Sequence, residues 1–278
     1  MKPIPWNDLI NRRMIVALIM GFSCGLPLLL TGSLLQGWMV AEGLDLTVIG
    51  LMALVGLPYT IKFLWAPFLD RYTLPFLGRR RGWLLTAQGL LLIAILGQGL
   101  FNPGNSPWLV ASAALVVSFF SASQDVVVDA YRREDLSDRE LGLGSSLYVN
   151  GYRLGMLLAG GGGLVLADRI SFSWVYLIMA VCMLPGLLTT ALTPEPTTPD
   201  GIPQTLRQAA LGPLREYFGR PLAGRILAFI LLYKIGDTMA GAMATPFYLD
   251  IGFSMTQIGT VANLFGFWAT IGGGLAGG

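Results

Sequence analysis

The stretch Ser121-Ala-Ser-Gln-Asp-Val-Val-Val-Asp-Ala-Tyr-Arg132 holds the feature from which the fold can be inferred. Two carboxylates, Asp125 and Asp129, lie four residues apart near the end of an apolar run that begins around Trp108. In a helix this spacing places both side chains on one face. Ionisable side chains inside a membrane-spanning helix are rare, and each indicates a functional site. We therefore read the other apolar segments as the surroundings of this acidic face.

Composition indicates an integral membrane protein. Of the 278 residues, 54% are hydrophobic and 12% are charged, whereas a soluble domain carries roughly 25% charged residues. The sequence contains no histidine, which excludes histidine acid–base chemistry and histidine metal ligands. Cys24 and Cys182 lie in apolar segments without metal-ligand spacing, and we expect buried free thiols. We expect no cofactor, no metal, and no removable signal peptide at residues 1–13.

Eight apolar segments are long enough to cross a membrane as helices, because a span needs roughly 20 residues. They lie near residues 14–40, 48–69, 83–101, 108–131, 143–167, 172–192, 222–249 and 257–278. The predicted fold class is therefore an all-α membrane protein, a bundle of helices. In the fifth segment, Gly151, Gly155 and Gly160 to Gly163 favour close helix packing or bending.

Lys and Arg residues are distributed unequally between the two sides of these spans. The N-terminus and the second–third, fourth–fifth and sixth–seventh connections hold fourteen of them. The remaining connections hold only Arg169, while Lys62, Arg153 and Lys234 fall within spans. Cytoplasmic loops carry the excess of positive charge. We therefore expect the N-terminus and the connection after the sixth span to lie in the cytoplasm.

A Pro- and Thr-rich connection divides the chain. It opens as Thr193-Pro-Glu-Pro-Thr-Thr-Pro-Asp-Gly201, which cannot continue a helix. We expect a six-helix bundle at 1–192, a cytoplasmic linker at 193–221 and the start of a second bundle at 222–278. Apolar residues at helical spacing between Thr205 and Phe218 indicate a short amphipathic helix along the membrane surface. A plain linker with some helical character is the alternative.

An internal repeat supports this division. Residues 43–50, Gly-Leu-Asp-Leu-Thr-Val-Ile-Gly, match residues 252–259, Gly-Phe-Ser-Met-Thr-Gln-Ile-Gly, at four of eight positions. Both copies follow the first span of a predicted half, as in transporters built from parallel repeats. We therefore expect a truncated transporter, consisting of one six-helix half and the first two helices of the other.

Charged residues at similar depths in several spans form the predicted site. At about 1.5 Å per helical residue, Asp125 and Lys62 lie roughly 10–13 Å inside the cytoplasmic end. We expect proton coupling at Asp125 and Asp129, with Asp129 nearer the surface and able to orient arginines. Substrate binding is predicted for Lys62, Gln124, Arg153, Tyr152, Gln36, Lys234 and Asp237. The alternative is a set of ion pairs that only orient helices, with Lys234 and Asp237 satisfying each other.

Four motifs resemble a known family. The loop Asp70-Arg71, followed by Gly78-Arg79-Arg80-Arg81-Gly82, resembles the signature loop of the major facilitator superfamily, although six residues separate its halves where one is normal. Three further stretches look like the AmpG-type muropeptide permeases of Gram-negative bacteria. They are Gly21-Phe-Ser-Cys-Gly-Leu-Pro-Leu-Leu-Leu-Thr-Gly-Ser33, Ile61-Lys-Phe-Leu-Trp-Ala-Pro67 and Ser123-Gln-Asp-Val-Val-Val-Asp-Ala-Tyr-Arg132.

The resemblance implies a major-facilitator-type bundle in the bacterial inner membrane that imports anhydromuropeptides by proton symport. It implies roles in peptidoglycan recycling and in β-lactamase induction. Its partners would be the muropeptide, protons and membrane lipids; we expect a monomer, driven by the proton gradient, that binds no nucleic acid. It matches Asp125 and Asp129 to the acidic pair of the family. The corresponding gating loop comprises Asp70, Arg71, Arg79, Arg80 and Arg81.

Two other functions fit the same spans. A drug/proton antiporter of this fold would use Asp125 as a counter-ion for cationic compounds. An intramembrane enzyme acting on lipid-linked cell-wall precursors is the second alternative. The absence of histidine and the transporter-like repeat argue against the enzyme.

Overall fold

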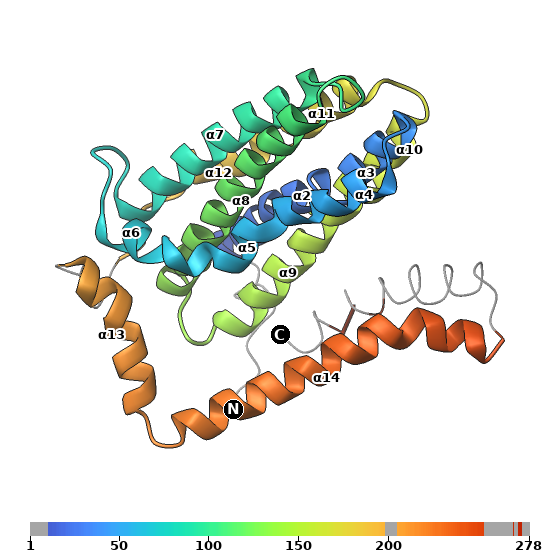
Figure 1. Cartoon of the computed structure of the whole chain (residues 1–278). Helices are drawn as coiled ribbons and strands as arrows, with labels where there is room; N and C mark the ends of the chain where they lie inside the picture. Colours follow the sequence, from blue (N-terminus) through green and yellow to red (C-terminus); the bar gives the residue numbers. More distant parts are fainter. Residues whose placement is uncertain (1–10, 198–204, 253–268, 270–271, 274–278) are drawn as a thin grey trace. The chain divides into compact units, whose positions relative to one another are not determined.

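The computed structural model describes residues 11–197, 205–252, 269 and 272–273, with the backbone alone at 237–250 (Figure 1). The chain divides between residues 202 and 203 into a larger first unit and a smaller second unit. Every regular element among the described residues is a helix, which confirms the predicted all-α fold class.

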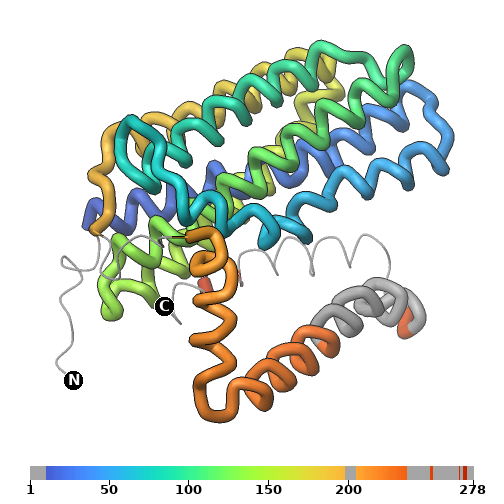
Figure 2. Tube along the Cα trace, turned by 60° about the vertical axis from the view of Figure 1, so that its left-hand side comes forward, coloured from blue at the N-terminus to red at the C-terminus, as the bar shows by residue number. Residues whose placement is uncertain are grey.

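The first unit is a bundle whose helices run side by side (Figures 1 and 2). Its elements are α2 (Arg12–Leu30), α3 (Ser33–Ala41), α4 (Leu46–Leu51), η1 (Met52–Gly56), α5 (Leu57–Ile61), η2 (Lys62–Leu64), α6 (Ala66–Arg71), α7 (Arg79–Leu100), α8 (Pro107–Asp135), α9 (Leu141–Leu157), η3 (Leu158–Gly162), α10 (Gly163–Ala167), α11 (Phe172–Val181) and α12 (Leu184–Leu192).

Five helical runs in the described residues are long and apolar enough to cross a membrane. They are Arg12–Ala41, Leu46–Leu64, Arg79–Leu100, Pro107–Asp135 and Phe172–Leu192. They match the first four predicted segments and the sixth. The predicted segment at 143–167 is helical as well, in α9, η3 and α10, but it is not among these five.

The second span matches the apolar segment predicted at 48–69, but it is not a regular α-helix. It is a series of short α-helical and 3₁₀ turns between Leu46 and Arg71. Pro58 and Pro67 lie in the first turns of α5 and α6, where a proline ring is tolerated but cannot extend a preceding helix. Lys62 therefore begins a 3₁₀ turn, η2, and does not lie in a regular helix.

Helices α2 and α9 approach each other backbone to backbone. A Cβ on any of four glycines would overlap a carbonyl oxygen of the facing helix: Gly21 and Gly25 on α2, Gly151 and Gly155 on α9. Small residues at such a crossing let two membrane helices pack closely. At the other end of α9 the helix widens into the π-helix η3 at the glycine run.

Helix α8 lies at the centre of the first unit. It contributes Val110, Val117 and Val128 to three separate apolar clusters, which the other helices complete. The polar residues of α8 between Ser118 and Asp125 are therefore enclosed by apolar packing on the buried side of the helix.

One end of the first unit is rich in arginine and is called the basic end below. The chain reaches it at Arg12, Arg71, Arg79 and Arg132, and again after Leu192. The Asn11 side chain caps α2 by accepting from the Met14 N–H at 3.2 Å. Such a cap satisfies one of the N–H groups that a helix leaves unpaired at its start.

The second unit contains α13 (Leu206–Gly219) and α14 (Ala223–Asp250). Thr205 caps α13 by accepting from the Gln208 N–H at 3.1 Å. Helix α14 covers the predicted segment at 222–249. Residues 253–259 of the second repeat copy, and most of the predicted segment at 257–278, lie outside the described residues.

Candidate functional site

A buried ion pair joins the second span to α8. Lys62 Nζ lies 3.4 Å from Asp125 Oδ2, and the two side chains are 33% and 9% exposed. The other carboxylate oxygen, Oδ1, has no hydrogen-bond partner among the described residues. A carboxylate with one oxygen paired and the other unpaired can accept a proton without first breaking a second bond. The structure thus brings together two of the residues predicted from the sequence.

Polar side chains from two further helices surround Asp125. The Cys24 thiol of α2 and the hydroxyl groups of Tyr148 and Tyr152 on α9 interact electrostatically with its carboxylate. Gln124, predicted to bind substrate, is fully buried and donates from Nε2 to Cys24 Sγ at 3.1 Å. It therefore faces the α2 contact and does not line an open surface. Among the described cysteines, Cys24 and Cys182 are both free.

Asp129 has a different environment from Asp125. Its side chain is 51% exposed and pairs with Arg132 at 3.2 Å, one turn further along α8. The Arg132 guanidinium also lies 4.2 Å from the centre of the Tyr148 ring, a cation–π contact. The two acids of the opening stretch therefore differ in burial and in partner.

The other predicted site residues have separate environments, and of these only Tyr152 also faces Asp125. Arg153 is half-buried and forms no ion pair with any described residue, so the grouping of two acids with three bases stays a prediction. Gln36 is exposed on α3, and Tyr152 packs beside Tyr148 with ring centres 6.3 Å apart. Lys234 belongs to the second unit. The side chain of Asp237 lies outside the described residues.

The predicted gating loop forms a charge cluster with α8. Arg79 Nη2 and Arg80 Nη2 lie 2.7 and 2.6 Å from Glu134 Oε1. Arg80 Nη1 lies 2.6 Å from Asp70 Oδ1. Arg79 and Arg80 are buried, so these pairs hold the loop against the basic end. Glu134 was not predicted, although its place directly after Arg132 and Arg133 could have indicated a pairing residue.

The start of α7 is capped by a residue distant in sequence. Glu195 accepts from the backbone N–H groups of Arg80 and Arg81 at 2.7 and 2.9 Å. Arg81 in turn donates to the carbonyl oxygens of Thr190 and Ala191 at the end of α12. A carboxylate suits a helix N-terminus because of the unpaired N–H groups and the helix dipole. Sequence reasoning placed Glu195 in a linker and missed this role.

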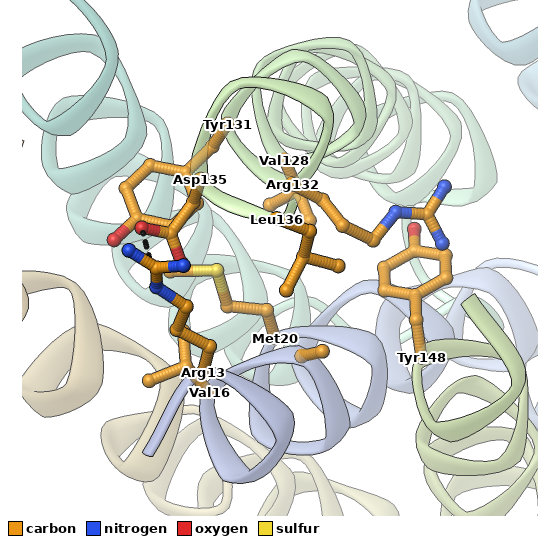
Figure 3. A pocket seen from close by; sticks show the side chains of 10 residues that line it. Arg13, Val16, Met20, Val128, Tyr131, Arg132, Asp135, Leu136 and Tyr148 are labelled. Atoms are coloured by element: carbon orange, nitrogen blue, oxygen red, sulfur yellow. Dashed lines mark ion pairs between the residues drawn. The ribbon is translucent and has the colours of Figure 1, made fainter. Parts of the chain in front are cut away.

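A recess of about 290 Å³ opens at the basic end between α2, α8 and the residues after α12. Figure 3 shows a smaller pocket next to this recess, between α2, α8 and α9, where Arg13 and Asp135 form an ion pair and Arg132 lies next to the Tyr148 ring. Glu140 closes the recess, accepting hydrogen bonds from Ser137, Asn11 and Arg13. Burial acts to raise the pKa of Glu140, but these hydrogen bonds outweigh it and lower the pKa to about 2.

These helices define a multi-pass membrane protein with a buried ion pair between two spans. The chain belongs to the Major Facilitator Superfamily, whose family model matches residues 13–278. It is 47% identical over 268 residues to the anhydromuropeptide permeases of Escherichia coli K12 and of E. coli O157:H7. It is 43% identical over 277 residues to an uncharacterized protein of Haemophilus influenzae.

The matches cover most of this chain and a smaller part of its relatives. They include 96% of the chain against the E. coli permeases and 98% against the H. influenzae protein. They include 55% and 65% of those relatives, so the chain spans about half the length of the curated permeases that it matches. The resemblance to AmpG-type permeases is confirmed, and the E. coli relatives are permeases, which supports a transporter over an enzyme.

Proposed function

We propose that this chain acts in proton-coupled import of anhydromuropeptides, that is, N-acetylglucosaminyl-1,6-anhydro-N-acetylmuramic acid with or without its peptide. The substrate is proposed from the 47% identity to E. coli proteins named for anhydromuropeptide transport. Import of this kind would serve peptidoglycan recycling and, through it, β-lactamase induction. The proton gradient would drive it without a cofactor.

The observation that carries the coupling is the Lys62–Asp125 pair. Protonation of Asp125 would remove the negative charge that holds Lys62, and the freed ammonium group could then attract the carboxylates of a muropeptide. Charges at membrane depth need a partner or water. Loss of the proton toward the cytoplasm would restore the pair and reset the transporter. This sequence of steps fits alternating access around a site near the midplane.

The proposed orientation in the membrane rests on the distribution of positive charge. Arginines gather at the basic end of the first unit, and positive residues favour the cytoplasmic side. We place the basic end, and with it the N-terminus, on the cytoplasmic face of the inner membrane. Cysteine labelling from either side of sealed vesicles, at Asp138→Cys and Asn102→Cys, would check this orientation, because these positions lie at opposite ends of the bundle.

The function is tested by uptake of radiolabelled anhydromuropeptide into proteoliposomes that carry the chain. An inward proton gradient should drive uptake, and a protonophore should abolish it. Asp125→Asn should reduce gradient-driven uptake to background, whereas Asp125→Glu should retain part of it. Asp45→Asn is the matched control, because Asp45 caps α4 outside the spans and Asn is an equally good cap.

Two results would contradict the proposal. Uptake that does not depend on the proton gradient would rule out proton coupling. Unchanged gradient-driven uptake in Asp125→Asn would show that coupling does not pass through the Lys62–Asp125 pair.

A further inference from the structure

The recess at the basic end combines charges of both signs in a space that a small ligand can occupy. Its volume is about 290 Å³, close to the lower limit for small-molecule sites, roughly 300 Å³. Arg12 and Arg13 from the start of α2 line it together with Asp135, the last residue of α8, and Glu140 from the loop that follows. A ligand that carries both a cation and an anion would complement this lining.

Asp135 is the acid of the recess that has few partners. Its ion pair with Arg13 is long, with Nε 3.7 Å from Oδ1, and its carboxylate accepts no hydrogen bond from any described residue. Its side chain is 13% exposed. Glu140, by contrast, accepts hydrogen bonds from Asn11, Arg13 and Ser137. A largely buried carboxylate is normally hydrogen-bonded, so Asp135 can accept from a cationic donor placed in the recess.

Arg12 supplies a positive charge that a ligand can reach. Its side chain is exposed, and among the described residues its guanidinium is bonded only to the carbonyl oxygen of Leu192, through Nη2. A guanidinium has five N–H donors and can bind a phosphate with two of them at once. Arg12 also interacts electrostatically with the Asp135 carboxylate. An anion on Arg12 and a cation on Asp135 can therefore belong to one small molecule.

Apolar side chains continue from Arg12 along two membrane spans. Ile15 lies one turn beyond Arg12 on α2 and is 52% exposed. Leu192 is 74% exposed, and Leu188, one turn earlier on α12, is 56% exposed. The bond from Arg12 to Leu192 O joins the two helices at this point. This surface suits an acyl chain attached to the charged group in the recess, whereas a soluble ion would leave it uncovered.

We propose that the recess binds the headgroup of phosphatidylethanolamine, with the phosphate on Arg12, the ammonium group on Asp135 and an acyl chain along Leu188 and Leu192. The ammonium group offers three N–H donors to the carboxylate. Basic pockets between membrane helices bind anionic headgroups, but the carboxylates of this recess repel a headgroup that carries negative charge alone. The inference uses the membrane spans and does not depend on the proposed transport.

Native mass spectrometry of the detergent-solubilised chain tests the proposal. Titration with phosphatidylethanolamine or phosphatidylglycerol of identical acyl chains gives the dissociation constant of the first bound lipid. Phosphatidylglycerol has the phosphate but no ammonium group. Phosphatidylethanolamine should bind about tenfold tighter, the factor expected for one hydrogen bond between charged groups. Equal dissociation constants for the two lipids would overturn the proposal, and this comparison needs no variant.

Variants assign the two charges of the headgroup. Asp135→Asn should weaken binding of phosphatidylethanolamine to the level of phosphatidylglycerol, and Arg12→Gln should weaken binding of both lipids. Asp138→Asn and Arg133→Gln are the matched controls, because these residues pair with each other at the same end and do not line the recess. Both controls should bind as the wild type does. Equal binding of phosphatidylethanolamine by Asp135→Asn and Asp138→Asn would overturn the assignment.

A soluble competitor distinguishes a lipid from a free zwitterion. Glycerophosphoethanolamine carries the same phosphate and ammonium groups without acyl chains. It should displace phosphatidylethanolamine only at about a hundredfold higher concentration or more, because burial of part of an acyl chain adds to the affinity. Displacement at equal concentration would show that the recess takes a soluble zwitterion and would overturn the lipid assignment. These measurements use neither muropeptide nor gradient, so they are judged separately from uptake by Asp125→Asn.

Discussion

At the scale of single residues, the two members of the Lys62–Asp125 pair differ in their exposure. Asp125 is nearly enclosed, whereas a third of the Lys62 side chain is exposed. Removing the lysine would leave a buried carboxylate with no charge partner, which costs more free energy than the pair itself contributes. Removing the carboxylate leaves an ammonium group that can reach solvent or the headgroups.

We expect Lys62→Met to lower the free energy of unfolding by about 1–3 kcal/mol, below the usual cost for a fully buried pair because Lys62 is partly exposed. Adding Asp125→Leu to Lys62→Met should recover most of the loss. The measurement is equilibrium unfolding in mixed micelles, analysed as a double-mutant cycle. Arg133→Met is the control, since its pair with Asp138 is exposed and should contribute about 0–1 kcal/mol. Equal effects of Lys62→Met and Arg133→Met would contradict the prediction.

Glu140 gives a pH dependence with a defined sign. Its pKa is lowered from an ordinary value of 4.5 to about 2, so the folded chain favours the charged carboxylate. The stabilisation is present above pH 4.5 and is lost as the pH falls toward 2. We therefore expect the melting temperature of the wild type to fall more steeply across this range than that of Glu140→Gln. Thermal unfolding in detergent at several pH values measures this, and parallel curves would refute it.

At the scale of elements, the glycine crossing of α2 and α9 sets the position of the residues around Asp125. Cys24 lies beside Gly25 on α2, and Tyr148 and Tyr152 lie beside Gly151 on α9. A side chain at the crossing would push the helices apart and move these groups away from Asp125. The small residues thus act on the site through the spacing of the backbone.

We expect Gly151→Ala to destabilise the chain by about 1–3 kcal/mol, the usual cost of overpacking, because the added Cβ overlaps the backbone of Leu18. Gly89→Ala is the matched control on α7, where a Cβ meets no atom within 4 Å. It should be neutral or stabilising by up to about 1 kcal/mol, since alanine favours the helix. The measurement is thermal unfolding of both variants side by side. Equal melting temperatures would show that the added Cβ at Gly151 does not overpack the α2–α9 crossing.

The sequence predicted helices more reliably than contacts between them. Length and hydropathy located the spans, because crossing a membrane requires a long apolar run. The irregular helix around Lys62 could have been predicted from Pro58 and Pro67. A proline inside a helix lacks the backbone N–H for the helical hydrogen bond, and its ring clashes with the preceding turn. Asp125 pairs with Lys62 and not with Arg153, and this choice depends on how the helices rotate against one another. That rotation follows from packing at residues such as Gly25 and Gly151, which no local pattern shows.

At the scale of the first unit, the two ends of its sequence are tied at the basic end. Arg12 donates to Leu192 O, and Tyr131 donates to Pro194 O at 3.0 Å. Glu195 caps α7, and Arg81 binds the end of α12. These contacts hold the first, third, fourth and sixth spans together at the basic end.

We expect Glu195→Ala to cost about 1 kcal/mol, the usual contribution of a helix N-cap. The loop at 72–78 should then loosen, and trypsin should cleave faster at Arg79, Arg80 and Arg81. Mass spectrometry of timed digests in detergent measures the cleavage rate. Glu42→Ala, at the opposite end of the bundle, should leave the rate unchanged. Equal rates in Glu195→Ala and the wild type would show that the cap does not hold the loop.

The distant cap of α7 also has a consequence for biosynthesis. Glu195 is separated from Arg80 by 115 residues, so the start of α7 is capped only after α8 to α12 have been made. Until Glu195 leaves the ribosome, the N–H groups of Arg80 and Arg81 depend on water for their hydrogen bonds. The loop between the second and third spans is therefore among the last parts of the first unit to reach its final form during translation.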